Sequence, residues 1–441
     1  MDRVAEAAVL RALRPAGWRV RVAAVALLAV VGVGAFAWIH QLRHGLGVTG
    51  LDRPAYWGLY MANFVFFIGI SHAGTLVSAI LRVVQAEWRR PITRAAEVIT
   101  VFGLLFGALS VLMDLGRPDR LLFVLVHGRL QSPIVWDVIC ISVYLTASCV
   151  YLWLPLIPDL ALLRDRGVRP AWLYRTGAMG WQGTPTQRRR LDRAIGVMAL
   201  AIIPIAVSVH TVVSYIFATT SQPGWQSTIF GPYFVVGAIF SGIAALLIVM
   251  GILRRALGLQ AVLRDVHFNN LALLLLAMDG IMIYFTFNVF LVEITGREPD
   301  ILPVVLEKVT GRYAFLFWAM IGGAFVLPGL ILAFPRGRSV AGCMVAATLI
   351  LVGMWVERFL IVAPTLLHPR LPWEAAWYTP TWVEWAATAG CLAGFALCYL
   401  GFARFYPIVS IWEVREGAER AATDAAARIA RYMPASDAEP A

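Results

Sequence analysis

The sequence predicts an all-α integral membrane protein with about ten transmembrane helices. The chain has 441 residues, of which 60% are hydrophobic and only 14% charged, far more apolar than a soluble domain. The apolar residues recur in long runs, each able to cross about 30 Å of hydrocarbon at about 1.5 Å per helical residue. The predicted spans cover residues 20–41, 57–82, 95–115, 133–157, 194–217, 231–253, 268–293, 312–334, 339–362 and 382–405.

The first run, 20–41, has the motif Ala35-Phe36-Ala37, which resembles a signal-peptide cleavage site. Its length, and the lack of a soluble domain after it, favour a retained helix. The spans and their spacing divide the chain into four expected parts. These are 1–56 (N-terminal tail and first helix), 57–217 and 218–363 (two four-helix bundles), and 364–441 (last helix and cytoplasmic tail).

The net charge of +11 comes almost wholly from arginine, since Lys308 is the only lysine. Most arginines lie in the tails and in alternate loops, which the positive-inside rule assigns to the cytoplasm. We therefore expect a bacterial inner-membrane protein with both termini cytoplasmic, in contact with lipids and not with nucleic acid. The loop 158–193, with Arg188–Arg190, could rest on anionic lipid, dock a partner or be solvated. The Ala-, Glu- and Arg-rich tail from about 411 predicts an amphipathic helix.

All five cysteines lie inside apolar segments and none forms a CxxC or CxxCH motif. Iron–sulfur ligation, structural zinc and covalent c-type haem therefore have no support in the sequence, and no metal site is predicted.

Ionisable residues inside apolar runs are the main functional candidates, because such groups are costly at membrane depth unless they face a partner, a cavity or a ligand. Asp114 ends the third span, Asp137 begins the fourth and His210 lies near the outer end of the fifth. We expect these three at similar depth near the outer face, below Arg117 in the following loop. His72 is expected deeper, on a different face.

Helical spacing adds two tyrosines and an aspartate to this set. Tyr144 shares a stripe with Asp137 on the fourth span, and Tyr60 lines the outer mouth on the second. Asp279, in the middle of the seventh span, joins His72 as a candidate for a proton path toward the inside. Oxidation of a quinol removes two electrons and two protons, and a carboxylate and an imidazole beside an aromatic slot suit that chemistry.

Structural roles are the alternative for each residue. Asp114 could pair with Arg117 at the mouth, and Asp137 could complement the dipole of its helix. His210 and His72 could each bond a nearby carbonyl, while Glu293, Glu357 and Arg358 are expected near outer helix ends as structural residues.

At these residues the chain resembles the NrfD/PsrC family of membrane subunits and, within it, the ActC and ActF subunits of alternative complex III. Six stretches carry the resemblance, in order: GISHAGTLVSAILR (69–82), EWRRPITRAAE (87–97), SPIVWDV (132–138), IPDLALLRDR (157–166), SVHTVVSYIFA (208–218) and QPGWQSTIFGPYFVVGAIFSG (222–242). From the seventh span onward we find little likeness.

The resemblance implies two four-helix bundles flanked by two further helices. It implies a quinone or menaquinone as bound substrate near the outer face, with no haem or iron–sulfur cluster in this chain. Electrons would pass to an iron–sulfur subunit and a multihaem cytochrome c subunit, beside a second NrfD-like membrane subunit. By position, the motif residues are Asp137, His72 and His210.

Two positions depart from the ActC pattern. Asp114 stands where a histidine of an H-x-G-R element is expected, and Ile216 stands where an acid often follows the fifth-span histidine. These departures leave open an ActF-like paralogue that conducts protons without oxidising quinol.

Two other classes of protein remain as alternatives. A b-type cytochrome anchor needs facing histidines at like depth, and His72 and His210 are expected at unlike depths. A solute or ion transporter favours broken helices that meet at mid-membrane. The first six spans are expected to be unbroken, apart from Pro204 in the fifth.

Overall fold

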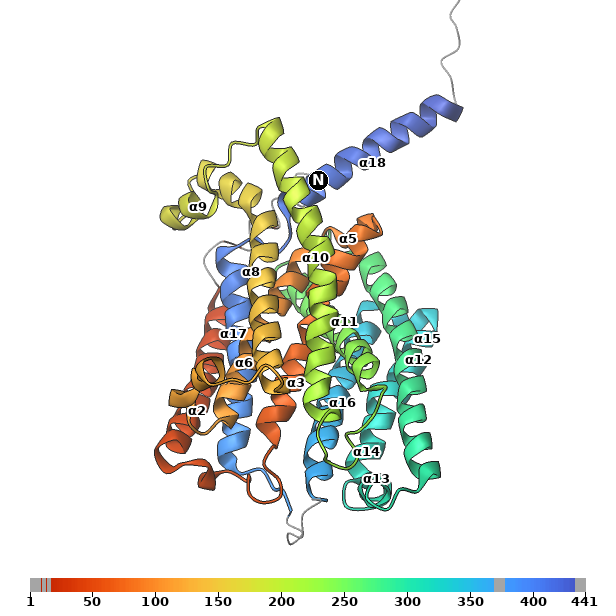
Figure 1. Cartoon of the computed structure of the whole chain (residues 1–441). Helices are drawn as coiled ribbons and strands as arrows, with labels where there is room; N and C mark the ends of the chain where they lie inside the picture. The colour runs from red at the N-terminus through yellow and green to blue at the C-terminus, as the bar shows by residue number, and fades with distance from the viewer. Residues whose placement is uncertain (1–8, 10–12, 14–16, 369–376, 433–441) are drawn as a thin grey trace, which may run out of the picture.

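The computed structural model describes residues 9, 13, 17–368 and 377–432, and the regular secondary structure of this part is helical, with ten helices long and apolar enough to cross a membrane (Figure 1). The predicted fold class is confirmed. The spanning elements are α2 (Trp18–His44), α3 to α5 (Leu59–Val83), α6 (Thr93–Asp114), α8 (Pro133–Asp165), α10 (Pro185–Ala218), α11 (Phe230–Ala256), α12 (Asp265–Gly296), α14 to α15 (Ala314–Ala333), α16 (Val340–Leu366) and α17 (Trp382–Phe405).

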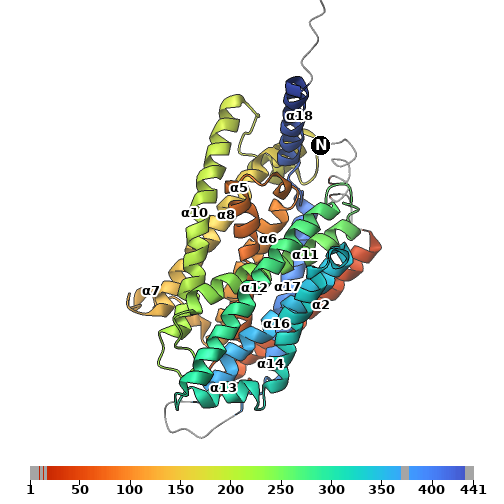
Figure 2. The same cartoon turned by 90° about the vertical axis from the view of Figure 1, so that its right-hand side faces the viewer.

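The helices form two packed groups and a peripheral pair. The first bundle comprises the second span with α6, α8 and α10, and the second bundle comprises α11, α12, the α14–α15 span and α16. Helix α11 packs against both α3 and α10, and α16 packs against α3, so these contacts join the bundles. Figure 2 shows α16 and α11 between α10 on one side and α2 on the other.

The peripheral pair α2 and α17 packs along its length and rests on α6. Two glycines permit this approach, because a Cβ atom on Gly34 would lie 2.7 Å from the Cα of Gly390. Small residues at such crossings bring helix backbones close enough for dispersion to hold them together. The predicted division at 56, 217 and 363 stays a prediction, and its outer parts include residues outside the described ranges.

The two ends of the molecule differ in charge. We call the end formed by residues 82–94, 158–193, 254–265, 335–338 and 411–432 the basic end, and the end formed by 45–58, 115–132, 219–229 and 297–313 the far end. Further helices lie at both ends of the molecule. The basic end has η3 (Glu87–Arg89), α9 (Ala171–Gly177), η6 (Pro335–Arg338) and α18 (Ile411–Tyr432). The far end has η1 (Leu46–Val48), η4 (Pro118–Arg120), α7 (Phe123–Val126) and α13 (Leu302–Val309).

The second span crosses as one helical segment, Leu59–Val83, with right-handed helical dihedrals at Ser71 and Thr75, but it is not α-helical along its whole length. Helix α3 ends at Ile70, α4 covers only His72–Gly74, and the π-helix η2 runs from Thr75 to Ile80. A π-helical turn shifts the i→i−4 ladder and is often found at functional sites. Ser71 lies between α3 and α4, and its carbonyl accepts a hydrogen bond of 2.5 Å from the Thr100 hydroxyl of α6.

Helix α18 confirms the predicted C-terminal helix and is anchored to the basic end by its first turn. Asp159 of α8 accepts hydrogen bonds from the backbone N–H groups of Ile411 and Trp412, at 3.0 and 3.1 Å. Asp159 also pairs with Arg94 of α6 at 2.6 Å, with both side chains 1% exposed. Beyond this anchor α18 runs outward from the bundle (Figure 1).

Candidate functional site

The centre of the candidate site is a pair of buried histidines. The rings of His72 on α4 and His210 on α10 meet edge to face, with 3.9 Å between their centroids. The Nε2 atom of His72 lies 3.0 Å from the carbonyl oxygen of Ala206, and its Nδ1 atom has no hydrogen-bond partner. Neither ring nitrogen of His210 has a partner, although the residue is 0% exposed.

The expectation that these histidines lie at unlike depths is therefore wrong for their side chains. His72 follows the far-end start of its span by 13 residues, or about 20 Å of helix, and His210 precedes the far-end terminus of α10 by eight, or about 12 Å. Side chains tilt toward the N-terminus of their helix. Because the two helices run in opposite directions, the side chains converge from different levels.

The close contact also bears on the haem alternative. Axial imidazoles of a b-type haem lie on opposite faces of the porphyrin. Rings with centroids 3.9 Å apart leave no room for a porphyrin plane between them. In this arrangement the pair therefore cannot serve as a bis-imidazole haem site.

Hydroxyl groups continue the polar interior from the histidines toward the basic end. Tyr144 of α8 stacks edge-on against His72, with ring centroids 5.6 Å apart. The Tyr144 hydroxyl lies 2.6 Å from the hydroxyl of Thr75 and donates to the carbonyl of Ser71 at 3.3 Å. Tyr144 thus lies beside His72, about 10 Å along α8 from Asp137, and its part in binding quinol stays a prediction.

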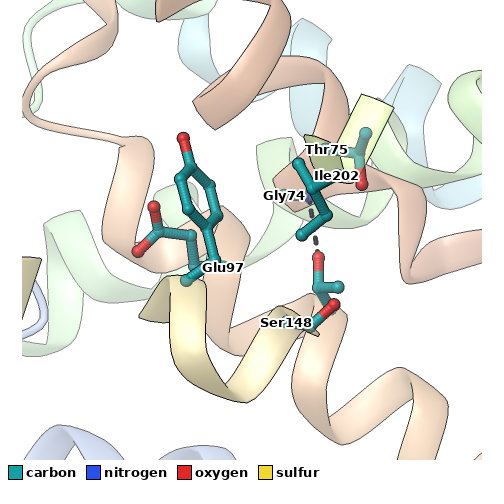
Figure 3. Close-up of a pocket in the computed structure, with 7 residues that line it drawn as sticks. Gly74, Thr75, Glu97, Ser148 and Ile202 are labelled. Atoms are coloured by element: carbon teal, nitrogen blue, oxygen red, sulfur yellow. Dashed lines mark hydrogen bonds between the residues drawn. The ribbon is translucent and has the colours of Figure 1, made fainter. Parts of the chain in front are cut away.

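Below these hydroxyls lies a small cavity with about 180 Å³ of empty space. Glu97, Ser148, Thr75 and Ile202 surround this space in Figure 3, and Gly74, Thr100 and Tyr151 complete its lining. The hydroxyl of Ser148 is buried without a hydrogen-bond partner, so the cavity has polar groups that an internal water would satisfy.

Glu97 is the acid of this cavity, and sequence reasoning assigned it no role. Its Oε1 accepts a 2.5 Å hydrogen bond from Ser78 of η2, whose hydroxyl also lies 3.0 Å from that of Tyr151. Its Oε2 has no partner, and the residue is 3% exposed. One sequence feature could have identified Glu97: it is an acidic residue near the start of the apolar helix α6, at the end of the motif EWRRPITRAAE.

Charged residues close the basic end beneath Glu97. Arg82 pairs with Glu413 of α18, and Arg89 lies 3.8 Å from the same carboxylate. Glu87 bonds Arg90 at the surface, and this hydrogen bond lowers the pKa of the Glu87 carboxyl below its ordinary value. A continuous series of polar side chains thus leads from His210 to charged groups at the basic end.

Toward the far end, Asp137 lies on the same face of α8 as Tyr144 and Tyr151, as the spacing of seven residues predicts. Asp137 is 7% exposed, and its Oδ1 atom is buried without a partner. Among the contacts of the described residues, no hydrogen bond, ion pair or ring contact joins Asp114, Asp137 and His210 to one another. The expected cluster of these three residues near the outer face therefore stays a prediction.

Asp114 and Tyr60 lie in a separate polar group under the peripheral helices. The Tyr60 hydroxyl donates to Gln41 of α2 at 2.6 Å, and Gln41 donates to the carbonyl of Met113 at 2.7 Å. Both Asp114 and Tyr60 interact electrostatically with Glu384 of α17. Sequence spacing cannot place Gln41 and Glu384 here, because they come from the two ends of the chain.

The remaining predicted residues are distributed elsewhere. Arg117 is exposed and pairs with Asp119 at 3.0 Å, not with Asp114, and its hydrogen bond lowers the pKa of Asp119. Asp279 is 3% exposed in α12 and has an unpartnered Oδ1. A Cβ atom on Gly329 of α15 would lie 2.6 Å from its Oδ2. Asp279 thus belongs to the interior of the second bundle, away from the helices that hold His72.

The five cysteines are free, and in the part of the chain that the structure describes no three His, Cys, Asp or Glu side chains gather closely enough to hold a metal ion.

Comparison with known proteins matches this architecture over most of the chain. The family model described as "Polysulphide reductase, NrfD" covers residues 47–369. A putative dimethyl sulfoxide reductase membrane protein of Halobacterium salinarum, the C subunit, is 29% identical, over 93% of each chain. The C subunit of the selenate reductase of Mesobacillus selenatarsenatis is 24% identical, over 83% of this chain and 89% of that protein. The menaquinone reductase integral membrane subunit of Nitratidesulfovibrio vulgaris is 24% identical, over 86% and 89%.

These relatives are named as subunits of reductases, in agreement with the ten spans and the buried polar interior described above. Because the family model covers well over half of its residues, the chain belongs to the NrfD polysulphide reductase family of membrane subunits.

Proposed function

We propose that this chain is the quinone-interacting membrane subunit of an electron-transfer complex of the alternative complex III kind. The observation that carries the proposal is the buried His72–His210 pair, with unpartnered ring nitrogens and a polar connection to the basic end. Imidazole exchanges protons near neutral pH, which is what quinol oxidation or quinone reduction requires. Relatives named for menaquinol or menaquinone chemistry add support.

The proposed substrate is a quinone, menaquinone among them, bound near the far end. Asp137 and His210 accept the protons released from quinol or bind its oxygens, and Asp114, Arg117 and Tyr60 shape the mouth. Electrons leave to an iron–sulfur subunit and onward to a multihaem cytochrome c subunit, beside a second NrfD-like membrane subunit. This chain contributes no haem or iron–sulfur cluster in the proposal.

The arginine distribution supports an orientation with the basic end in the cytoplasm of a bacterium, because cytoplasmic loops carry the excess of Lys and Arg. Protons then move between His72 and the cytoplasm by way of Tyr144, the cavity at Ser148 and Glu97. Asp279 is proposed as a proton-path residue of the second bundle, since a buried and unpartnered carboxyl group is costly without a role.

The test begins with the native complex, purified from membranes by a tag on this chain. Co-purification of an iron–sulfur protein and a multihaem cytochrome supports the assigned class, whereas a stable chain without any redox partner supports a transporter. In the assembled complex, Asp137→Asn should slow quinol oxidation between pH 6 and 8 without loss of subunits. Unchanged turnover across that range would remove Asp137 from the proposed site.

One observation favours a second candidate, an ActF-like subunit that conducts protons without oxidising quinol. Asp114 interacts with Glu384 and Tyr60, not with Asp137 or His210, and Ile216 occupies the position of the family acid. In that case Asp137→Asn leaves quinol turnover intact, while Glu97→Gln still alters proton movement.

A further inference from the structure

The second bundle holds a buried ion pair next to the histidines. Glu357 and Arg358 are neighbours on α16, 2% and 1% exposed, with 2.8 Å between Oε2 and Nη1. They lie nine and eight residues from the far-end terminus of α16, a spacing like that of His210 from the far-end terminus of α10. Apart from this ion pair and the neighbouring Tyr233, the Glu357 oxygens and the terminal nitrogens of Arg358 have no hydrogen-bond partner. Buried charges in this state are costly, which points to a role or to internal water.

Arg358 faces the boundary between the two bundles. Its guanidinium lies over the ring of Phe234 on α11, 5.0 Å from the centroid. It also lies against Gly237, where an added Cβ atom would come within 2.6 Å of Nη2. Helix α11 packs directly on α10, and Arg358 is close enough to His210 to interact with it electrostatically. Arg358 therefore lies at the boundary of the second bundle, next to the helix α11 that packs on the helix carrying His210.

Two adjoining cavities connect this region to the far end. The outer one is a groove of about 480 Å³ between α12 and the segments 226–229 and 296–301, open to the surroundings. The inner one is smaller, about 50 Å³, which is room enough for water. Val289 and Glu293 line both cavities, so the carboxyl group of Glu293 stands where the groove meets the inner cavity.

The inner cavity is lined by groups that can carry or orient protons. Lys308, the only lysine of the chain, lines it and interacts electrostatically with both Glu293 and Glu357. The Tyr233 hydroxyl lies 3.4 Å from the Thr286 hydroxyl, and Tyr233 also interacts with Glu357. Polar groups thus reach without interruption from the groove to the ion pair.

We propose that Glu293, Lys308 and Glu357 form the far-end half of the proton route, entered through the second bundle. A proton accepted by His210 passes across the boundary between the bundles, by way of internal water, to the Glu357 carboxylate, which pairs with Arg358. It then crosses the water-filled inner cavity past Lys308 to Glu293 and leaves through the groove. No bond other than those to the moving proton is made or broken. This inference rests on the proposed role of His210 as a proton acceptor.

The experiment measures quinol oxidation and proton release by the assembled complex in liposomes. Glu357→Gln removes the titratable carboxyl group with little change of shape. Lys308→Met removes the ammonium group from the inner cavity and leaves the Glu293 carboxyl group in place. Each should lower turnover about tenfold or more at pH 7, with the KM for quinol unchanged. A small weak acid, formate, should restore turnover in Glu357→Gln, because it reaches the inner cavity through the groove. A purely structural defect gives no such rescue.

Glu298→Gln is the matched control, since Glu298 lines the open rim of the groove and should be replaceable by bulk water. Glu357→Asp, which keeps a carboxyl group, should retain most of the turnover if the fold is intact. Full turnover in Glu357→Gln and Lys308→Met, together with loss of turnover in His210→Gln, would overturn the route and leave the proposed function standing. Full turnover in all three would overturn the proposed function itself. A low turnover that formate does not restore would also count against the route.

Discussion

His72 and His210 approach each other from antiparallel helices, with 3.9 Å between their ring centroids, and together present three ring nitrogens without hydrogen-bond partners. Such a pair can hold one proton between two bases, because a second positive charge at this distance is strongly opposed. It lies where the first bundle meets α11, and hence between the polar groups of both bundles. This position makes it the natural target for the first prediction.

His210→Gln should lower quinol turnover about a hundredfold, the order of magnitude that a general base contributes. Assembly should be retained, because His210 makes no hydrogen bond that the substitution would break. Steady-state quinol oxidation by the purified complex measures the effect. The control is His44→Gln, at an exposed histidine on α2. Equal turnover in the two variants would contradict a role for His210 in proton transfer.

Glu97→Gln should slow proton exchange with the basic end, while quinol binding is unchanged. Glutamine can still accept the hydrogen bond from Ser78 but has no proton to give up near neutral pH. The measurement is the rate of proton uptake on the basic side of liposomes that contain the complex. Glu419→Gln, on the outward part of α18, is the control for a lost negative charge. If proton uptake in Glu97→Gln matches the control, the cavity at Ser148 is not part of the route.

Asp159→Asn should destabilise the protein by about 3–5 kcal/mol, because it leaves the buried Arg94 without its counter-charge. It should also loosen α18, whose first turn bonds to this carboxylate. Thermal unfolding in detergent and limited proteolysis of α18 report the two effects. Asp165→Asn breaks only a partly exposed pair with Arg164 and should cost at most about 1 kcal/mol. Similar melting temperatures for the two variants would show that the buried pair contributes little.

Gly242→Ala should destabilise the contact between the bundles by about 1–3 kcal/mol. The added Cβ atom would lie 2.6 Å from the backbone nitrogen of Ala73, so α11 and the second span must move apart beside His72. Gly401→Ala on α17 is the matched control, since no atom lies within 4 Å of its added Cβ. Thermal unfolding compares the two, and quinol turnover should fall only in Gly242→Ala. An unchanged melting temperature and turnover in Gly242→Ala would mean that the two bundles can separate at this contact without moving the histidines.

Eight of the ten spans could be predicted from the sequence to within about four residues, whereas α8 and α10 extend eight and nine residues beyond the expected spans at the basic end. The third span, expected at 95–115, is Thr93–Asp114, and the tenth, expected at 382–405, is Trp382–Phe405. This succeeds because crossing a membrane depends on the length and polarity of one continuous segment, both local properties. The irregular turn at Ser71 was missed because the contacts that stabilise it, from Thr100 of α6 and Tyr144 of α8, come from residues far away in the chain.

Among the candidate residues, the sequence identified His72 and His210 but placed them apart. Counting residues along a helix gives the height of each Cα atom. It does not show that side chains on antiparallel helices tilt toward each other. Glu97 received no role, and Glu357 and Arg358 received only a structural one. These side chains contact residues of other helices, and the periodicity along one helix does not show which residues of other helices lie nearby.

The sequence by itself thus determined the membrane class, the number of spans, the family and most of the ionisable residues buried in the bilayer. Those properties follow from which residues a segment contains and in what order. Only the tertiary structure decided which residues meet: His72 with His210, Glu97 with Ser78, Tyr60 with Gln41, and Arg358 with the boundary between the bundles. The reason is physical, because helix crossing, helix direction and side-chain tilt set contacts between segments far apart in the chain, and no local pattern records them.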